Sequence, residues 1–259
     1  MRNSRLYREN RKTSISKKRF LIILKVYGFR FVGAALNWFL LKWINNGQLA
    51  YQGVIFSQIT GSSVVETAWV SIVQNVSTFP APIVAAWCLD YFGRKKTLSF
   101  GWFLLALSSF LLGGFYVDLS RHTAGFAVVA TVPLFMEYFI FNPLYVIPTE
   151  IFPTSIRGRM TGLNTAFGTA GGIAGTEAYI RLKQSFGGGT SGLRAIQYLN
   201  GGLSMLGLVV ALALIPERNG CSLTEEDRTY NISIGISQGD SSNVRDEDNE
   251  LAMVPVANE

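Results

Sequence analysis

The sequence predicts an all-α membrane protein with six transmembrane helices. Two long runs, Thr67 to Leu89 and Thr97 to Tyr116, contain no charged residue. Each run can cross a bilayer core, which needs about 20 helical residues. Between them lies a short, strongly charged segment, Asp90 to Lys96. Its lysines and arginine favour the membrane surface, so we expect the chain to reverse direction there.

The six expected spans follow one another within a membrane unit of residues 20–216. They cover residues 31–55, 63–89, 97–116, 124–147, 160–180 and 195–215. The first span is interrupted by polar residues such as Lys42 and Asn45. The second contains Pro80 and Pro82, and prolines in membrane helices usually bend them.

The two ends of the chain are polar and oppositely charged. Residues 1–19 hold eight of the 23 lysines and arginines, and residues 217–259 hold ten of the 17 acidic residues. We interpret the first as a basic cytoplasmic arm and the second as an acidic, disordered cytoplasmic tail. A basic arm beside membrane helices usually sets the orientation of the protein and binds anionic lipid. The expected partner is therefore the lipid bilayer and not nucleic acid.

The distribution of positive charge predicts the orientation. The N-terminal arm, the Arg94–Lys96 turn and the Pro148–Arg159 turn carry more lysine and arginine than the opposite loops, which offer Arg121, Lys183 and Arg194. Positive loops stay in the cytoplasm. With an even number of spans, both termini are expected there.

Few residues in this sequence suit enzymatic chemistry. Cys88 and Cys221 are the two cysteines and His122 is the one histidine. They form no metal-ligand spacing and no disulfide framework. We also find no nucleophile paired with a base. The sequence therefore predicts a protein that is not an enzyme, with no cofactor and no metal.

Charged residues inside the spans point to a pathway for a solute or an ion. Glu137 is the clearest, because it is the only charged residue of the fourth span. Its carboxylate could take up and release a proton, and Asn142 could hydrogen-bond a solute. Lys42 is a candidate anion ligand or a partner for Glu137. The alternative for Lys42 is that it extends to the membrane interface.

The fifth span is rich in glycine at four-residue spacing. Small residues at this spacing let two membrane helices approach closely, so we assign them a packing role. They are Gly168, Gly171, Gly172 and Gly175.

Both charged turns resemble loop motifs of the major facilitator superfamily. The first reads Asp-x-x-Gly-Arg-Lys-Lys, and the second, from Pro148 to Gly158, resembles the Pro-x-Glu-x-x-Pro signature of sugar, organic-ion and phosphate transporters. In that family such turns form a cytoplasmic gate of charge pairs. The resemblance assigns these charge pairs to Asp90, Arg94, Glu150 and Arg157. Gly93, Lys95 and Pro153 belong to the same cytoplasmic gate motif. The alternative for the first turn is that it only anchors the membrane topology. The alternative for the charge pairs is that they form a static structural clamp.

The resemblance implies a fold of twelve helices in two halves, with the solute held between them. The two motifs match the second half, so the chain is similar to the C-terminal six-helix half. We expect a missing N-terminal half, in the same polypeptide or in a partner chain. The 259 residues alone are not expected to transport well.

The segments around Trp38, Gly168 to Ile173 and Ile215 to Glu217 are similar to proton-coupled phosphate transporters and glycerophosphodiester permeases. This resemblance places Trp38 on the solute path. It differs at Lys42 and Asn46, where the phosphate transporters carry Asp and Tyr. The expected function is therefore proton-coupled symport of a phosphate-containing or other small polar solute, in the plasma membrane. Sugar or organic-ion transport remains open, as does a non-transporting protein that pairs with a full-length relative.

Overall fold

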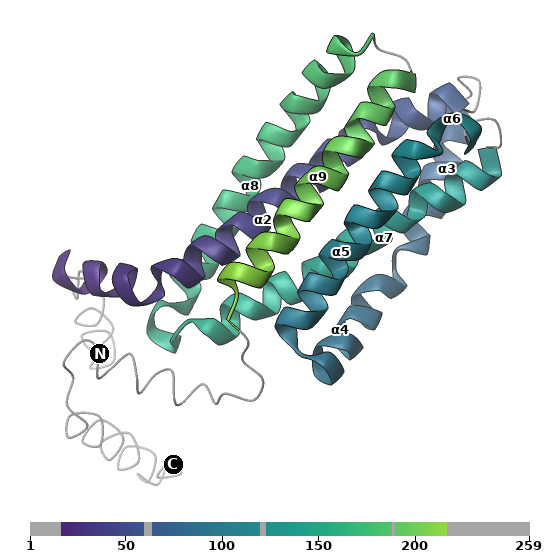
Figure 1. Ribbon diagram of the computed structural model, residues 1–259. Helices are drawn as coiled ribbons and strands as arrows, with labels where there is room; N and C mark the ends of the chain where they lie inside the picture. Colours follow the sequence, from purple (N-terminus) through teal and green to yellow (C-terminus); the bar gives the residue numbers. More distant parts are fainter. Residues whose placement is uncertain (1–16, 60–63, 120–122, 188–189, 217–259) are drawn as a thin grey trace, which may run out of the picture.

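Helices make up the secondary structure of the described part of the chain. The computed structural model describes residues 17–59, 64–119, 123–187 and 190–216. The helices are α2 (Lys17–Ile59), α3 (Val64–Ser77), α4 (Pro80–Phe92), α5 (Arg94–Gly114), α6 (Tyr116–Leu119), α7 (Thr123–Ile151), α8 (Thr154–Ser185) and α9 (Thr190–Leu214). The long helices run alongside one another as a bundle (Figure 1). The expected acidic tail and residues 1–16 of the basic arm lie outside the described residues.

The second expected span is divided into two helices. α3 ends at Ser77 and α4 begins at Pro80, which has no backbone N–H to donate into the preceding turn. At the break, the Thr78 hydroxyl donates to the carbonyl of Asn75 at 2.7 Å. The prolines expected to bend this span therefore stand where the helix is interrupted and restarts.

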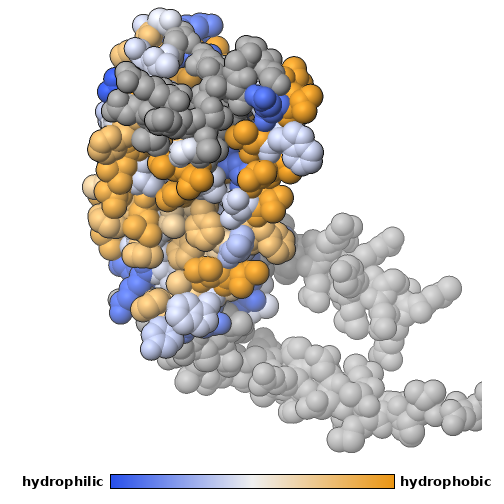
Figure 2. Space-filling view, turned by 90° about the vertical axis from the view of Figure 1, so that its right-hand side faces the viewer, coloured by the Kyte–Doolittle hydropathy of each residue, from blue (hydrophilic) through white to orange (hydrophobic). Residues whose placement is uncertain are grey.

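Four stretches of the described residues are long and apolar enough to cross a membrane: Val64–Phe92, Arg94–Gly114, Val128–Ile151 and Thr190–Leu214. Large hydrophobic side chains such as Trp69, Phe79 and Trp87 are exposed on them. Figure 2 shows hydrophobic residues across the middle of one face and hydrophilic residues toward its lower end. An apolar belt of this kind suits contact with lipid, since a soluble monomer rarely exposes so much apolar surface.

α2 and α8 are not among these four stretches, although each is long enough to span a bilayer. α2 carries polar residues, including Lys42, Asn45 and Gln48, and runs through them without interruption. α2 contains no proline, so its backbone hydrogen bonds continue through these polar residues. α8 is rich in glycine and threonine, which lowers its hydropathy.

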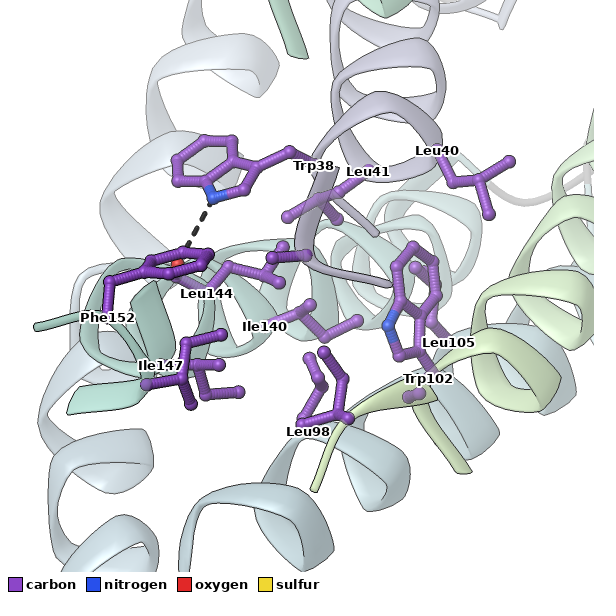
Figure 3. Close-up of a cluster of buried hydrophobic side chains, with 14 of the residues drawn as sticks. Trp38, Leu40, Leu41, Leu98, Trp102, Leu105, Ile140, Leu144, Ile147 and Phe152 are labelled. Carbon is purple, nitrogen blue, oxygen red and sulfur yellow. Dashed lines mark hydrogen bonds between the residues drawn. The ribbon is translucent and has the colours of Figure 1, made fainter. Parts of the chain in front are cut away.

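The core joins α2, α5, α7 and α9 around two buried tryptophans (Figure 3). The Trp38 indole N–H of α2 donates to the Leu144 carbonyl of α7 at 3.1 Å, and the Trp102 indole of α5 donates to Asn37 Oδ1 at 2.8 Å. Buried indoles need such partners, since an unpaired N–H in an apolar core is costly. These two bonds fix how α2 sits against α5 and α7, and so position the site described below.

Candidate functional site

An open groove of about 430 Å³ lies between α2, α4 and α7. Its volume falls in the range of small-molecule sites. Amide, hydroxyl, ammonium and aromatic groups line it together, from Lys42, Asn45, Pro82, Tyr138, Phe141, Asn142 and Tyr145. Three residues predicted from the sequence are thereby placed at one site: Lys42 and Asn142 line the groove, and Glu137 lies directly behind it.

Glu137 is fully buried in the bundle. Asn45 Nδ2 donates to its Oε2 at 2.8 Å, and Gln48 Nε2 donates to its Oε1 at 2.7 Å. Both amides come from α2, three residues apart, so one face of that helix holds both carboxylate oxygens. No lysine or arginine in the described part of the chain forms an ion pair with Glu137. Its carboxylate can therefore bind or lose a proton without breaking an ion pair.

Lys42 lies in the groove without reaching Glu137. Its Nζ is 4.8 Å from the centroid of the Phe141 ring, a cation–π distance. The side chain is half-buried and turned toward the groove lining, which differs from the alternative of extension to the membrane interface. Of the two roles the sequence suggested for Lys42, this position favours that of an anion ligand.

Asn142 and Trp38 have partners of their own. Asn142 Nδ2 donates to the Pro82 carbonyl of α4 at 2.7 Å, which ties α4 to α7 across the groove. Trp38 is buried behind the groove, and its ring packs edge-on against Tyr145 with centroids 4.7 Å apart. Asn142 thus lines the groove, whereas Trp38 is not part of the lining and packs against the lining residue Tyr145.

Sequence reasoning missed Asn45 and Gln48, and treated Asn45 only as an interruption of the first span. The signal that could have found them is their spacing. Asn45, Gln48 and Gln52 recur every three or four residues in an otherwise apolar helix. Polar residues on a single face of a membrane helix point toward a polar partner inside the bundle.

The two charged turns meet at one end of the bundle. Arg94, at the start of α5, forms a two-pronged ion pair with Glu150 near the end of α7: its Nη2 is 2.8 Å from Oε1 and its Nε 2.9 Å from Oε2. Arg94 Nη1 also donates to the Leu89 carbonyl at 3.5 Å. The fork of a guanidinium matches a carboxylate in this way, and lysine cannot reproduce it.

The other residues of the two turns shape the backbone or remain at the surface. Gly93 has a φ of 89°, which glycine adopts without strain. This conformation lets the chain turn from the end of α4 into the start of α5. Pro153 precedes α8, and Arg157 Nε donates to the Phe152 carbonyl at 3.4 Å. Asp90 and Lys95 differ in exposure, with Asp90 exposed and Lys95 half-buried. The structure thus brings Arg94 and Glu150 together, while Arg157 binds its own turn.

The glycines of α8 lie against α2. A Cβ on Gly171 would overlap the Phe39 carbonyl oxygen, and one on Gly175 would overlap the Trp43 carbonyl oxygen. Both obstacles are backbone atoms, which cannot swing away. Gly168 and Gly172 also face α2, where a Cβ would lie tightly against the Trp38 side chain and would overlap the Asn46 side chain. This close approach aligns α2, and with it the groove residues that α2 carries.

Among the residues that the structure describes, no group of three or more His, Cys, Asp or Glu could hold a metal ion. The groups that line the groove are amides, hydroxyls, aromatic rings and the Lys42 ammonium, and Asn45 joins them to the Glu137 carboxylate.

Comparison with known proteins agrees with this architecture. The family model described as "Sugar (and other) transporter" matches residues 4–230. The chain is 30% identical over 219 residues to the MFS-type transporter lnaF of Aspergillus flavus, covering 83% of this chain and 43% of that protein. It is 29% identical to the probable inorganic phosphate transporter 1-6 of Arabidopsis thaliana, covering 78% and 41%. It is 23% identical to the glycerophosphocholine permease GIT4 of Candida albicans, covering 89% and 44%.

A solved structure has a similar fold. The xylose transporter XylE from E. coli, in an inward-open conformation, matches with a TM-score of 0.55 at 15% identity, over 91% of this chain and 58% of that one. At this identity the likeness concerns the fold alone. The chain spans less than half the length of the curated relatives named above. With a family match over most of its length and apolar helices able to cross a bilayer, the chain is an integral membrane protein that belongs to the sugar (and other) transporter family of the major facilitator superfamily.

Proposed function

We propose that this chain forms the C-terminal half of a secondary transporter that moves a small polar solute together with a proton by alternating access. The observation that carries the proposal is Glu137, a buried carboxylate whose two oxygens are held by Asn45 and Gln48 behind the solute-sized groove. Intramembrane carboxylates facing the interior of a helix bundle are typical of proton-coupled pathways. The groove would bind the solute, and Asn45, which belongs to both sites, would link solute and proton.

The groove favours a solute that contains phosphate. Lys42 provides a cation, and Asn45 and Asn142 provide amide N–H donors, which together suit phosphate oxygens. The relatives named as phosphate transporters and a glycerophosphocholine permease support the same class. The second candidate is a sugar or organic ion. It is favoured by the two tyrosines and two amides of the lining and by the family match.

The proposal includes the membrane arrangement. α2 and α8 would complete a six-span half together with the four apolar stretches, since α8 packs its glycines against the α2 backbone and α2 turns its amides toward Glu137 of α7. Positive charge at the Arg94–Lys96 turn would place that end of the bundle, and both termini, in the cytoplasm of a plasma-membrane protein. Labelling single cysteines at Lys95 and Thr190 from either side tests this arrangement, and Lys95→Cys should react from the cytoplasmic side only.

The Arg94–Glu150 pair would brace the cytoplasmic end of this half while the halves rock. In the proposed cycle, Asp90, Lys95 and Arg157 contact the other half when the cytoplasmic side closes. An N-terminal half, in the same polypeptide or in a partner chain, is needed for this step. Transport by the 259 residues alone in liposomes would contradict it.

Solute binding can be tested on the chain itself. Purified protein in lipid nanodiscs would be titrated calorimetrically with inorganic phosphate, glycerophosphocholine and xylose. We expect binding of a phosphate compound that Lys42→Gln weakens severalfold. Arg181→Gln, which also removes one positive charge but at an exposed site on α8, should leave binding unaltered. Binding of xylose alone supports the second candidate. Binding without flux in a completed transporter indicates a non-transporting protein.

Proton coupling is tested in a transporter completed with its other half. Glu137→Gln should abolish accumulation driven by a proton gradient and spare solute exchange, because glutamine keeps the shape of the side chain but cannot carry the proton. Glu177→Gln removes an exposed carboxylate of α8 and serves as the control. Unchanged accumulation in Glu137→Gln would exclude Glu137 as the proton carrier.

A further inference from the structure

A second, smaller cavity lies on the other side of Glu137 from the charged turns. It holds about 30 Å³, room for about two water molecules if each needs roughly 10–15 Å³. Its lining comes from the ends of α2, α3, α5, α7 and α9 that are remote from Arg94 and Glu150. Four glutamines face it among apolar residues: Gln48, Gln52, Gln74 and Gln197.

The glutamines are arranged as a hydrogen-bonded lining with one acceptor left over. Gln52 Nε2 donates to Gln74 Oε1 at 2.6 Å, and Gln74 Nε2 donates to the Ala130 carbonyl at 3.0 Å. Gln197 is 2% exposed, and its Oε1 has no partner. A buried polar atom without a partner beside a polar cavity of this size is the usual setting of an internal water molecule.

Gln48 connects this cavity to Glu137. It lines the cavity and donates to Oε1, whereas Asn45 lines the groove and donates to Oε2. The two oxygens of one carboxylate are therefore bound by two amides that line two different compartments. The groove has a volume of about 430 Å³, and the cavity has about 30 Å³ of room for water-sized species.

We propose that the glutamine-lined cavity is a hydrated proton-binding site that supplies Glu137 by a route separate from the solute groove. Its ligands are water and the hydronium ion. Hydronium in the cavity gives a proton to the free lone pair of Oε1, so that an O–H bond forms on Glu137 and a neutral water molecule remains. The inference deepens the proposed function and rests on Glu137 as the proton carrier.

The other titratable groups near Glu137 do not take its place. Tyr138 of α7 and Tyr179 of α8 lie close enough to feel its charge, and Lys42 of α2 lies on the groove side. Tyr179 donates its hydroxyl hydrogen to Asn200 Oδ1. Gln48 lines the cavity and binds the Glu137 carboxylate, whereas Lys42, Tyr138 and Tyr179 do not line the cavity.

The test is infrared spectroscopy of the full chain in lipid nanodiscs. The carboxylic acid band of Glu137, assigned by its loss in Glu137→Gln, shifts when the proton is replaced by deuterium, so its exchange after transfer to D₂O can be timed. Ala130→Leu extends a side chain into the cavity. Val129→Leu, on the neighbouring exposed residue, is the matched control. We expect severalfold slower exchange in Ala130→Leu and unchanged exchange in Val129→Leu.

A second pair of variants keeps the proposal testable if Ala130→Leu does not fold. Gln197→Met preserves the size of the side chain but removes the unpartnered oxygen, and should also slow exchange. Asn142→Trp obstructs the groove and should leave exchange unchanged. The proposal would be overturned if Asn142→Trp slowed the exchange and the cavity variants did not. It would also be overturned if the Glu137 acid band were absent between mildly acidic and neutral pH. Exchange of the Glu137 proton can be measured without transport. If the cavity variants slow this exchange but the completed transporter takes up no solute, only the transport proposal is refuted.

Discussion

Two carboxylates of the same helix, α7, are held in opposite ways. Glu150, near the helix end, is 31% exposed and is held by both prongs of the Arg94 guanidinium. Glu137, in the middle of the bundle, is fully buried and is held by two neutral amides. A charge-assisted pair fixes a shape, whereas an amide-bound carboxylate can change its charge while keeping its neighbours. The comparison sets a partly exposed ion pair between two helix ends against a buried carboxylate bound by neutral amides.

The largest expected effect comes from replacing Glu137 with leucine. Glu137→Leu leaves the Asn45 and Gln48 amides unpaired in the core. We expect the free energy of unfolding to fall by about 1 to 4 kcal/mol, since each interhelical hydrogen bond in a membrane contributes about 0.6 to 2 kcal/mol. Denaturation in mixed micelles measures this loss. Glu177→Leu, on an exposed residue of α8, is the control, and an equal effect in both variants would break the contrast.

A smaller effect is expected at the helix end. Glu150→Gln removes the charge from a partly exposed ion pair, and we expect a loss of about 0.5 to 1 kcal/mol. Arg94→Lys should cost a similar amount despite retaining the charge, because lysine lacks the two-pronged geometry. The same unfolding assay checks both variants. A wild-type value for Arg94→Lys would indicate that charge alone matters at this turn.

Salt should distinguish the two carboxylates further. At about 1 M salt the screening length is roughly 3 Å, so the partly exposed Arg94–Glu150 pair is weakened. The difference between wild type and Glu150→Gln should therefore shrink as NaCl rises. The difference between wild type and Glu137→Leu should stay the same, because the Glu137 site is buried and involves neutral amides. A Glu137→Leu effect that shrinks with salt would show that a mobile charge contributes to its site.

The smallest effect is expected at Asp90. It is exposed and acts on Arg94 only through the electrostatic attraction between their charges. Asp90→Asn should change the free energy of unfolding by less than about 0.5 kcal/mol, the usual range for surface substitutions. A loss of stability as large as that of Glu150→Gln would instead show that Asp90 stabilises the Arg94–Glu150 pair within this half. Asp90 would then not be reserved for a contact with the other half.

Much of the candidate site could be predicted because its chemistry is local in the sequence. A lone carboxylate in an uncharged run identifies Glu137, and the loop motifs identify Arg94 and Glu150 without a structure. The partners of Glu137 could not be paired with it in the same way. Asn45 and Gln48 lie about ninety residues before it, and polar residues in a weakly apolar helix indicate an interruption as readily as a binding face.

The sequence by itself determined the helical membrane class, the charged turns and the family, because hydrophobic run length and short motifs are read along the chain. The tertiary structure decided which amide binds which oxygen of Glu137, and that four glutamines from three helices line one cavity. The interruption between α3 and α4 was also decided there, although its prolines were visible in advance. The physical reason is that hydropathy and backbone propensity act between neighbours in sequence, whereas a hydrogen bond between helices depends on how their faces are rotated and packed.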